Sequence, residues 1–120
     1  MTLVVRRVTL EDSKIIFNWR NDSLTRKMFK NSKIIKHEEH TKWISSKLTD
    51  SNHCLLMCEF KKGQPLAFVH FGIDRHFAEI SINLSPTKRG EGLSAKCLEL
   101  SMNYFKNHYP AVSIILAKIK

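Results

Sequence analysis

The chain has 120 residues, of which 42% are hydrophobic, and it carries a formal net charge of +9 at pH 7. This length suits one domain with a real hydrophobic core, and no apolar run approaches the roughly 20 residues that a membrane-spanning helix needs. The excess of basic residues favours anionic partners. The lysines are scattered, however, and the sequence lacks a combined aromatic and basic platform for nucleic acid. We therefore expect phosphate-bearing small molecules as partners, and neither nucleic acid nor a membrane.

Three cysteines, Cys54, Cys58 and Cys97, occur in the chain. Cys54 and Cys58 lie four residues apart in a strand-like run, which is not a metal-ligand spacing. Free cysteines are usually buried, so we expect three buried thiols and no bound metal. The N-terminus enters a strand pattern directly, without the apolar stretch of a secretory signal. These features predict a cytoplasmic protein.

The alternation of apolar and polar residues predicts strands, and apolar residues three or four positions apart predict helices. The pattern predicts a single domain over residues 1–120 with the order β-α-α-β-β-β-α-β, which belongs to the α/β class. The predicted elements are a strand at Leu3–Val8, a helix at Leu10–Arg20, a short helical turn at Ser23–Phe29, a helix at His37–Leu48, strands at Cys54–Phe60, Pro65–Ile73 and Phe77–Leu84, a helix at Leu93–Lys106 and a strand at Ala111–Ala117.

The segment Ser85–Lys96 contains two glycines and connects the predicted strand Phe77–Leu84 to the predicted helix Leu93–Lys106. The first turn of a helix has backbone N–H groups without internal partners, and the helix dipole adds partial positive charge there. Gly90 and Gly92 remove two side chains, which allows a diphosphate to approach the backbone. Lys88 and Arg89 add charge at the rim of this loop. An ordinary strand-to-helix turn is the alternative interpretation.

The residues Arg89-x-x-Gly92-x-Ser94 resemble the acetyl-CoA loop of the GNAT acetyltransferase superfamily, in which Arg or Gln begins the motif. Ser94 stands where that family has Gly or Ala. The resemblance covers essentially the whole chain and implies a mixed, mostly antiparallel sheet with flanking helices, without the family's last helix and two strands. It also implies acetyl-CoA as cosubstrate. By this resemblance the cofactor-binding residues are Leu84, Lys88, Arg89, Gly90, Glu91, Gly92, Leu93 and Ser94.

The N-terminal third, with Phe17-Asn-Trp-Arg-Asn-Asp22 and His37-Glu-Glu-His-Thr-Lys-Trp43, looks like one GNAT branch. That branch N-acetylates a 4-amino-4,6-dideoxy sugar carried on UDP, in the pathway to nonulosonic acids such as pseudaminic acid. Each residue implied here also has a purely structural alternative, such as an arginine complementing a helix C-terminus or a half-buried histidine. The substrate-side residues implied by the resemblance are Arg20, Met28, Phe29 and His40.

Acetyl transfer to an amine needs a group that takes a proton from the amine and a backbone N–H that stabilises the oxyanion. Along the strand Phe77–Leu84, the side chains of Glu79, Ser81 and Asn83 share one face. We expect the catalytic residues to be Glu79, as the preferred base, and Asn83; an exposed structural carboxylate is the alternative for Glu79. In the family, a tyrosine on a helix after the fifth strand protonates the thiolate, and the sequence ends before that helix.

The predicted function is therefore acetyl-CoA-dependent transfer of an acetyl group to the amine of a nucleotide-linked amino sugar, an activity that the shortened sequence could impair. The alternatives are a GNAT enzyme that acts on a protein N-terminus or a small amine, and a non-catalytic module that binds CoA or a protein. The last predicted strand leaves an open sheet edge, and such edges pair with other chains. We expect self-association through this edge.

Overall fold

A computed structural model describes residues 2–28, 33–60 and 63–117 of the protein. Short 3-10 turns precede α1 and follow β4, at Leu10–Asp12 and Pro86–Lys88. The main elements in chain order are β1 (Leu3–Arg7), α1 (Ser13–Arg20), α2 (Ser23–Met28), α3 (His37–Thr49), β2 (His53–Phe60), β3 (Pro65–Asp74), β4 (Phe77–Leu84), α4 (Ser94–His108) and β5 (Ile114–Ala117).

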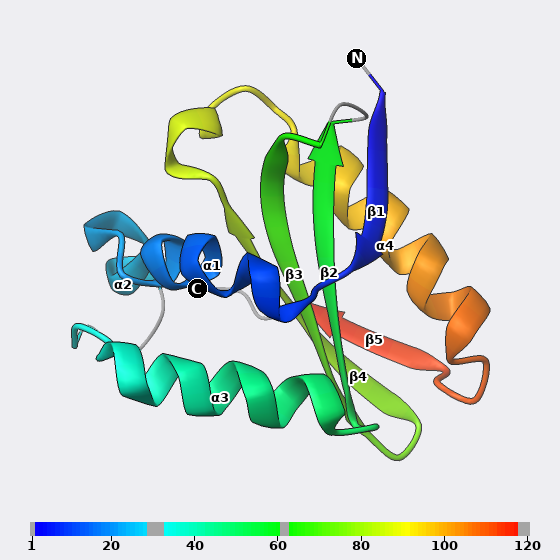
Figure 1. The fold of residues 1–120 in the computed structure, drawn as a ribbon. Coiled ribbons are helices and arrows are strands. Elements are labelled where there is room, and N and C mark those ends of the chain that lie inside the picture. Colours follow the sequence, from blue (N-terminus) through cyan, green and yellow to red (C-terminus); the bar gives the residue numbers. More distant parts are fainter. Residues whose placement is uncertain (1, 29–32, 61–62, 118–120) are drawn as a thin grey trace.

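The five strands form one sheet in the order β1-β2-β3-β4-β5 (Figure 1). The pairs β1–β2, β2–β3 and β3–β4 are antiparallel, whereas β4 and β5 are parallel because α4 connects them as a crossover. This arrangement confirms the predicted mixed, mostly antiparallel sheet with flanking helices. The predicted helical turn after the first helix is the six-residue helix α2.

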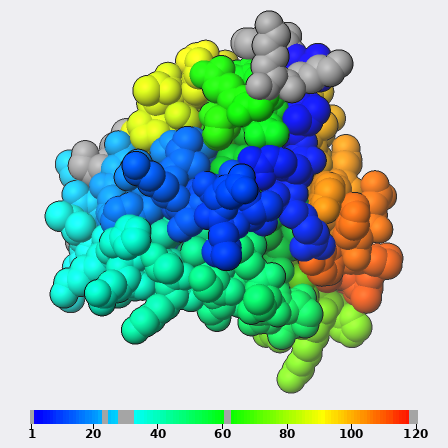
Figure 2. All heavy atoms as spheres, viewed as in Figure 1, coloured from blue at the N-terminus to red at the C-terminus, as the bar shows by residue number. Residues whose placement is uncertain are grey.

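Helices cover both faces of the sheet: α1 and α3 lie in front of it, and α4 lies behind it (Figure 1). In the space-filling view, the side chains of α1 and α3 cover much of the front (Figure 2). Successive residues of a strand point to opposite faces, so β2 sends Leu55 and Met57 to the α1 and α3 side and Cys54 and Leu56 to the α4 side. The buried run of β2 is therefore explained by helices on both sides.

The core behind the sheet is centred on a ring pair. Phe71 of β3 and Phe105 of α4 are both fully buried, and their ring centroids lie 4.1 Å apart in a stacked arrangement. Burial of a side chain of this size stabilises the fold by about 2–3 kcal/mol. This pair fixes α4, and with it the loop at the start of that helix, against the sheet.

The last strand begins three residues later than predicted. The strand was expected from Ala111, but β5 begins at Ile114. Val112 N–H donates to the Tyr109 carbonyl at 3.1 Å, which makes a turn, and Ser113 N–H donates to the His76 carbonyl at 2.9 Å. The backbone between α4 and β5 is thus used for turning, so only the last four residues of the predicted strand pair with β4.

The described residues also bear on the predicted absences. All three cysteines are buried and free. None of the helices in the described part of the chain is long and apolar enough to cross a membrane. Within residues 2–28, 33–60 and 63–117, no group of three or more His, Cys, Asp or Glu side chains is arranged to hold a metal ion.

Candidate functional site

The loop between β4 and α4 adopts a backbone that favours glycine. Gly90 and Gly92 have φ values of +80° and +72°, in the left-handed region that other residues rarely adopt. A Cβ added at either position would meet no heavy atom within 4 Å, so both glycines border open space. The helix α4 then begins at Ser94 without a side-chain cap, which leaves the N–H groups of its first turn for another partner.

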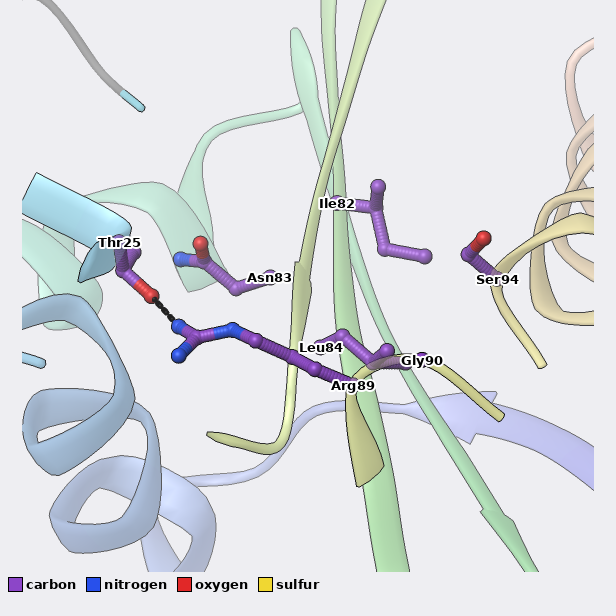
Figure 3. A pocket seen from close by; sticks show the side chains of 7 residues that line it. All are labelled: Thr25, Ile82, Asn83, Leu84, Arg89, Gly90 and Ser94. Atoms are coloured by element: carbon purple, nitrogen blue, oxygen red, sulfur yellow. Dashed lines mark hydrogen bonds between the residues drawn. The ribbon is translucent and has the colours of Figure 1, made fainter. Parts of the chain in front are cut away.

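A pocket of about 260 Å³ lies beside this loop at the edge of β4 (Figure 3). In the described residues, β5 pairs with β4 only from Phe77 to Ile80, and the pocket follows directly at residues 82–84. We call it the loop pocket. Its lining residues are Thr25, Ile82, Asn83, Leu84, Arg89, Gly90 and Ser94.

The Arg89 side chain crosses the loop pocket to the start of α2 (Figure 3). Its Nη2 lies 2.5 Å from Asp22 Oδ2 and 2.5 Å from Thr25 Oγ1. The same Asp22 oxygen accepts the Thr25 N–H at 3.1 Å. Hydrogen bonding from Arg89 is the main cause that lowers the pKa of Asp22. The side chain of Arg89, expected to contact the cofactor, therefore ties the glycine loop to α2, and its backbone stays at the rim of the loop pocket.

A second cluster joins α1 to α3. Arg20 Nη1 lies 3.0 Å from Nδ1 of His40, and His40 Nε2 lies 2.9 Å from the Ser13 carbonyl. The carbonyl only accepts, so Nε2 carries the ring proton and Nδ1 accepts from Arg20. The Arg20 guanidinium also lies over the Trp43 ring, 4.0 Å from its centroid. Burial lowers the pKa of both Arg20 and His40.

The described residues place no carboxylate within ion-pair distance of Arg20. The structure records four ion pairs among the described residues, and none of them includes Arg20. Burying a charge without a counter-charge costs free energy. An anionic ligand would remove this cost, which makes Arg20 the substrate-side residue with the clearest physical rationale. His40 is fully buried and orients Arg20 through its ring.

A further pocket of about 230 Å³ lies on the front face of the sheet near its β5 edge. His53 Nδ1 lies 2.9 Å from His70 Nε2, and Lys47 Nζ lies 3.3 Å from His53 Nε2. Burial is the main cause that lowers the pKa of His70, to about 4. We call this the histidine pocket; its lining residues are His53, His70, Gly72, Glu79, Ile80 and Ser81.

The two residues predicted as catalytic lie on the same face of β4 but in different pockets. Glu79 lines the histidine pocket and Asn83 lines the loop pocket, with Ser81 between them along the strand. Of the predicted substrate-side residues, Met28 ends α2 and Phe29 lies outside the described residues. Of the predicted cofactor-binding residues, Leu84, Arg89, Gly90 and Ser94 line the loop pocket, whereas Lys88, Glu91, Gly92 and Leu93 are not among its lining residues.

Sequence reasoning missed the pairing of His53 with His70 and the contact between Arg89 and Asp22. The first pair depends on the β2–β3 register, in which Leu55 faces His70 and His53 faces Gly72. A Cβ at Gly72 would lie 3.8 Å from His53 Cε1, an ordinary van der Waals contact, so the pair does not require a glycine there.

Comparison with known proteins identifies the fold. No protein-family model matches the chain, and no curated protein matches it. Solved structures do: an aminoglycoside acetyltransferase in complex with coenzyme A superposes with a TM-score of 0.82 at 16% identity, over 99% of this chain and 75% of that one. An acetyltransferase of the GNAT family from Streptococcus pneumoniae gives a TM-score of 0.74 at 16% identity, over 99% of this chain and 75% of that one. The chain has the GNAT fold.

A third GNAT-fold structure, the spermidine N-acetyltransferase from Vibrio cholerae in complex with CoA and spermine, gives a TM-score of 0.73 at 17% identity. The match covers 85% of this chain and 62% of that protein. At these identities the comparison establishes the shared fold, and the fold prediction is confirmed. The chain spans 62% to 75% of the lengths of these three proteins.

Proposed function

We propose that this protein is an acetyl-CoA-dependent N-acetyltransferase whose acceptor is a nucleotide-linked amino sugar. The observation that carries the proposal is the loop pocket. It combines two left-handed glycines, an uncapped helix start and a stretch of β4 that lies beyond the described pairing with β5. Backbone N–H groups that converge at a helix start bind phosphate. The solved structures with this fold include two with coenzyme A bound.

The residues around the loop pocket fit acetyl-CoA in chemistry. The N–H groups at the start of α4, with Gly90 and Gly92 beside them, would hold the diphosphate. The apolar side chains of Ile82 and Leu84 line the route from this loop along β4, where a pantetheine arm could pair with the strand as an added strand. Lys88 adds positive charge beside the loop, which favours a diphosphate, whereas the charge of Arg89 is paired with Asp22.

An anionic acceptor is supported by Arg20. This guanidinium is largely buried, its orientation is fixed by His40 and Trp43, and the ion pairs of the described residues leave it without a carboxylate. The diphosphate of a nucleotide sugar would supply the missing counter-charge. The net charge of +9 points the same way, because it attracts an anionic acceptor and repels a polyamine.

In the proposed reaction the acetyl group moves from the CoA sulfur to the acceptor nitrogen. The new C–N bond forms, the C–S bond breaks, and the amine proton passes to a base. Glu79 is our proposed base because it shares the front face of β4 with Ser81 and Asn83, and Asn83 borders the loop pocket. The CoA thiolate leaves and takes up a proton, which completes the transfer.

A thiol-release assay tests the proposal. Acetyl-CoA is supplied with a UDP-linked 4-amino-4,6-dideoxy sugar, with spermine, or with a peptide bearing a free N-terminus. We expect thiol release above background with the sugar nucleotide, and mass spectrometry should show its acetylated product. Acetylation of spermine or the peptide in preference to the sugar nucleotide would contradict the proposed acceptor. Absence of thiol release with all three would contradict the enzymatic function.

A further inference from the structure

The histidine pocket contains a chain of hydrogen bonds whose direction is fixed at one end. An ammonium group has only donors, so Lys47 Nζ donates to His53 Nε2 across 3.3 Å. His53 must then carry its proton on Nδ1, because a neutral imidazole has one N–H and one acceptor nitrogen. The opposite tautomer would point an N–H at the ammonium group, and the nearest carboxylate oxygen, Asp50 Oδ2, is 3.8 Å from Nε2.

The tautomer of His53 determines the tautomer of His70. With its proton on Nδ1, His53 donates to His70 Nε2 across 2.9 Å. His70 is therefore the acceptor at Nε2 and carries its own proton on Nδ1. No hydrogen bond is recorded for His70 Nδ1 within the described part of the chain. The series of hydrogen bonds thus ends at His70, which lines the histidine pocket and has an N–H donor at Nδ1.

Two aromatic neighbours hold the His70 ring in place. The Trp43 ring contacts it edge-on with centroids 5.7 Å apart, and the Phe68 ring stacks with it at 6.3 Å. Burial, together with the positive charges of Lys47 and Arg20, lowers the pKa of His70. His70 consequently stays neutral at pH 7, and it presents a fixed donor without a charge of its own.

Acidic and hydroxyl groups lie next to this donor. In the sheet, Ser81 faces His70 directly, and Glu79 is the diagonal neighbour of His70 through Gly72. Diagonal neighbours in an antiparallel pair have Cβ atoms about 7 Å apart. That spacing accommodates a small ligand fragment whose nitrogen faces the carboxylate and whose oxygen faces the imidazole N–H.

We propose that His70 donates its Nδ1–H to an oxygen beside the reacting amine of the acceptor, so that this site selects vicinal amino alcohols over simple amines. This inference rests on the proposed function and narrows its acceptor class. Glu79 faces the nitrogen of the amino alcohol. Lys47 and His53 act as positioning residues, because they set the tautomer of His70 and do not touch the acceptor.

The tautomer can be tested by NMR of the full chain with 15N-labelled histidine at pH 7, which needs no activity. We expect His53 and His70 in the Nδ1–H form. Lys47→Met should remove the bias and add an Nε2–H population at His53. Lys42→Met, an exposed lysine on the same helix, is the control and should leave both tautomers as in the wild type. A wild-type His70 that carries its proton on Nε2 would overturn the proposal.

Acceptor selection is tested with two probes that differ by one hydroxyl, trans-2-aminocyclohexanol and cyclohexylamine. We expect kcat/KM with acetyl-CoA to favour the amino alcohol by about fivefold, the scale of one neutral hydrogen bond. The ratio should fall towards one in His70→Phe and part of the way in Lys47→Met. His76→Phe, at an exposed turn, should keep the wild-type ratio. Equal use of both amines by the wild type would overturn the proposal.

A titration separates this inference from the proposed function. If neither amine is acetylated, the enzymatic function fails, and the two probes are titrated while the His70 ring signals are followed. A shift of His70 Nδ1 with trans-2-aminocyclohexanol, and a smaller one with cyclohexylamine, would support the site as a recognition site for amino alcohols. Equal shifts, or no shift with either probe, would overturn it.

Discussion

Arg20 Nη1 donates to His40 Nδ1 across 3.0 Å, while the Arg20 guanidinium lies over the Trp43 ring. A partly buried cation is thus oriented by a neutral ring on one side and an aromatic face on another. Cation–π contact and a single hydrogen bond compensate only part of the cost of burying a charge. The arrangement keeps the Arg20 guanidinium in a fixed orientation at the expense of stability, as expected of a residue that binds an anion.

Substitution of Arg20 tests its effect on UDP binding independently of its effect on the free energy of unfolding. Arg20→Met should weaken UDP binding by about 1–3 kcal/mol, the scale of a lost charge-assisted hydrogen bond. The free energy of unfolding should change little, because removal of the unpaired charge is offset by the loss of the donor to the buried His40 Nδ1. Titration calorimetry with UDP and chemical denaturation measure the two effects. Arg75→Met, at an exposed turn, is the matched control, and UDP binding that is unchanged in a folded Arg20→Met would rule out the anion site.

The low pKa of His70 makes stability depend on pH. Burial lowers this pKa from 6.5 to about 4. Below pH 6.5 the unfolded chain binds a proton that the folded chain takes up only near pH 4, so stability falls as the pH decreases through this window. The loss amounts to up to about 3 kcal/mol. In His70→Gln the decline from pH 7 to pH 4.5 should be shallower than in the wild type and in His76→Gln. Equal declines would contradict the burial of His70.

The ion pair between Asp22 and Arg89 links α2 to the glycine loop. Both side chains are about one quarter exposed, so we expect a coupling of about 1 kcal/mol. A double-mutant cycle with Asp22→Asn and Arg89→Met measures this coupling by denaturation. If the effects of the two substitutions simply add, the contact does not hold the loop. Acetyl-CoA affinity should fall in both single variants, because each releases the loop from α2.

Apolar side chains on the front of the sheet edge predict self-association. Phe77, Ile114 and Leu116 are 45%, 44% and 54% exposed, and the β4–β5 register places them on one face. A second copy of the chain could bury this patch by pairing at the β5 edge. Light scattering should show a dimer at micromolar concentration, and Leu116→Lys should give a monomer. The exposed substitution Val4→Lys is the control, and a monomeric wild type would disprove this prediction.

The sequence predicted the order of the elements because amphipathic periodicity is a local property. Its polar and apolar alternation also assigned Glu79, Ser81 and Asn83 to one face of β4, as the register confirms. The start of the last strand, which follows the crossover helix α4, was predicted less well. In the predicted strand Val112 has strand propensity, but the N–H groups of Val112 and Ser113 donate to the carbonyls of Tyr109 and His76, which uses this backbone for a turn.

The site could be predicted only where its residues are close in the sequence. Gly90 and Gly92 mark a turn whose positive φ values follow from local chemistry. The contact between Arg89 and Asp22 joins residues 67 positions apart, and the pair of His53 and His70 needs the exact β2–β3 register. Long-range contacts of this kind depend on how helices dock on a sheet, which periodicity does not encode.

Binding of acetyl-CoA to the glycine loop is the most direct test of the account. Gly92→Glu places bulk and negative charge where we expect the diphosphate. Gly63→Glu is the matched control, because Gly63 also has a positive φ, of +89°, and also borders open space, so both variants carry the same backbone strain. Isothermal titration should show acetyl-CoA binding to the wild type and to Gly63→Glu, and its loss in a folded Gly92→Glu. Equal affinity in all three proteins would contradict the central claim.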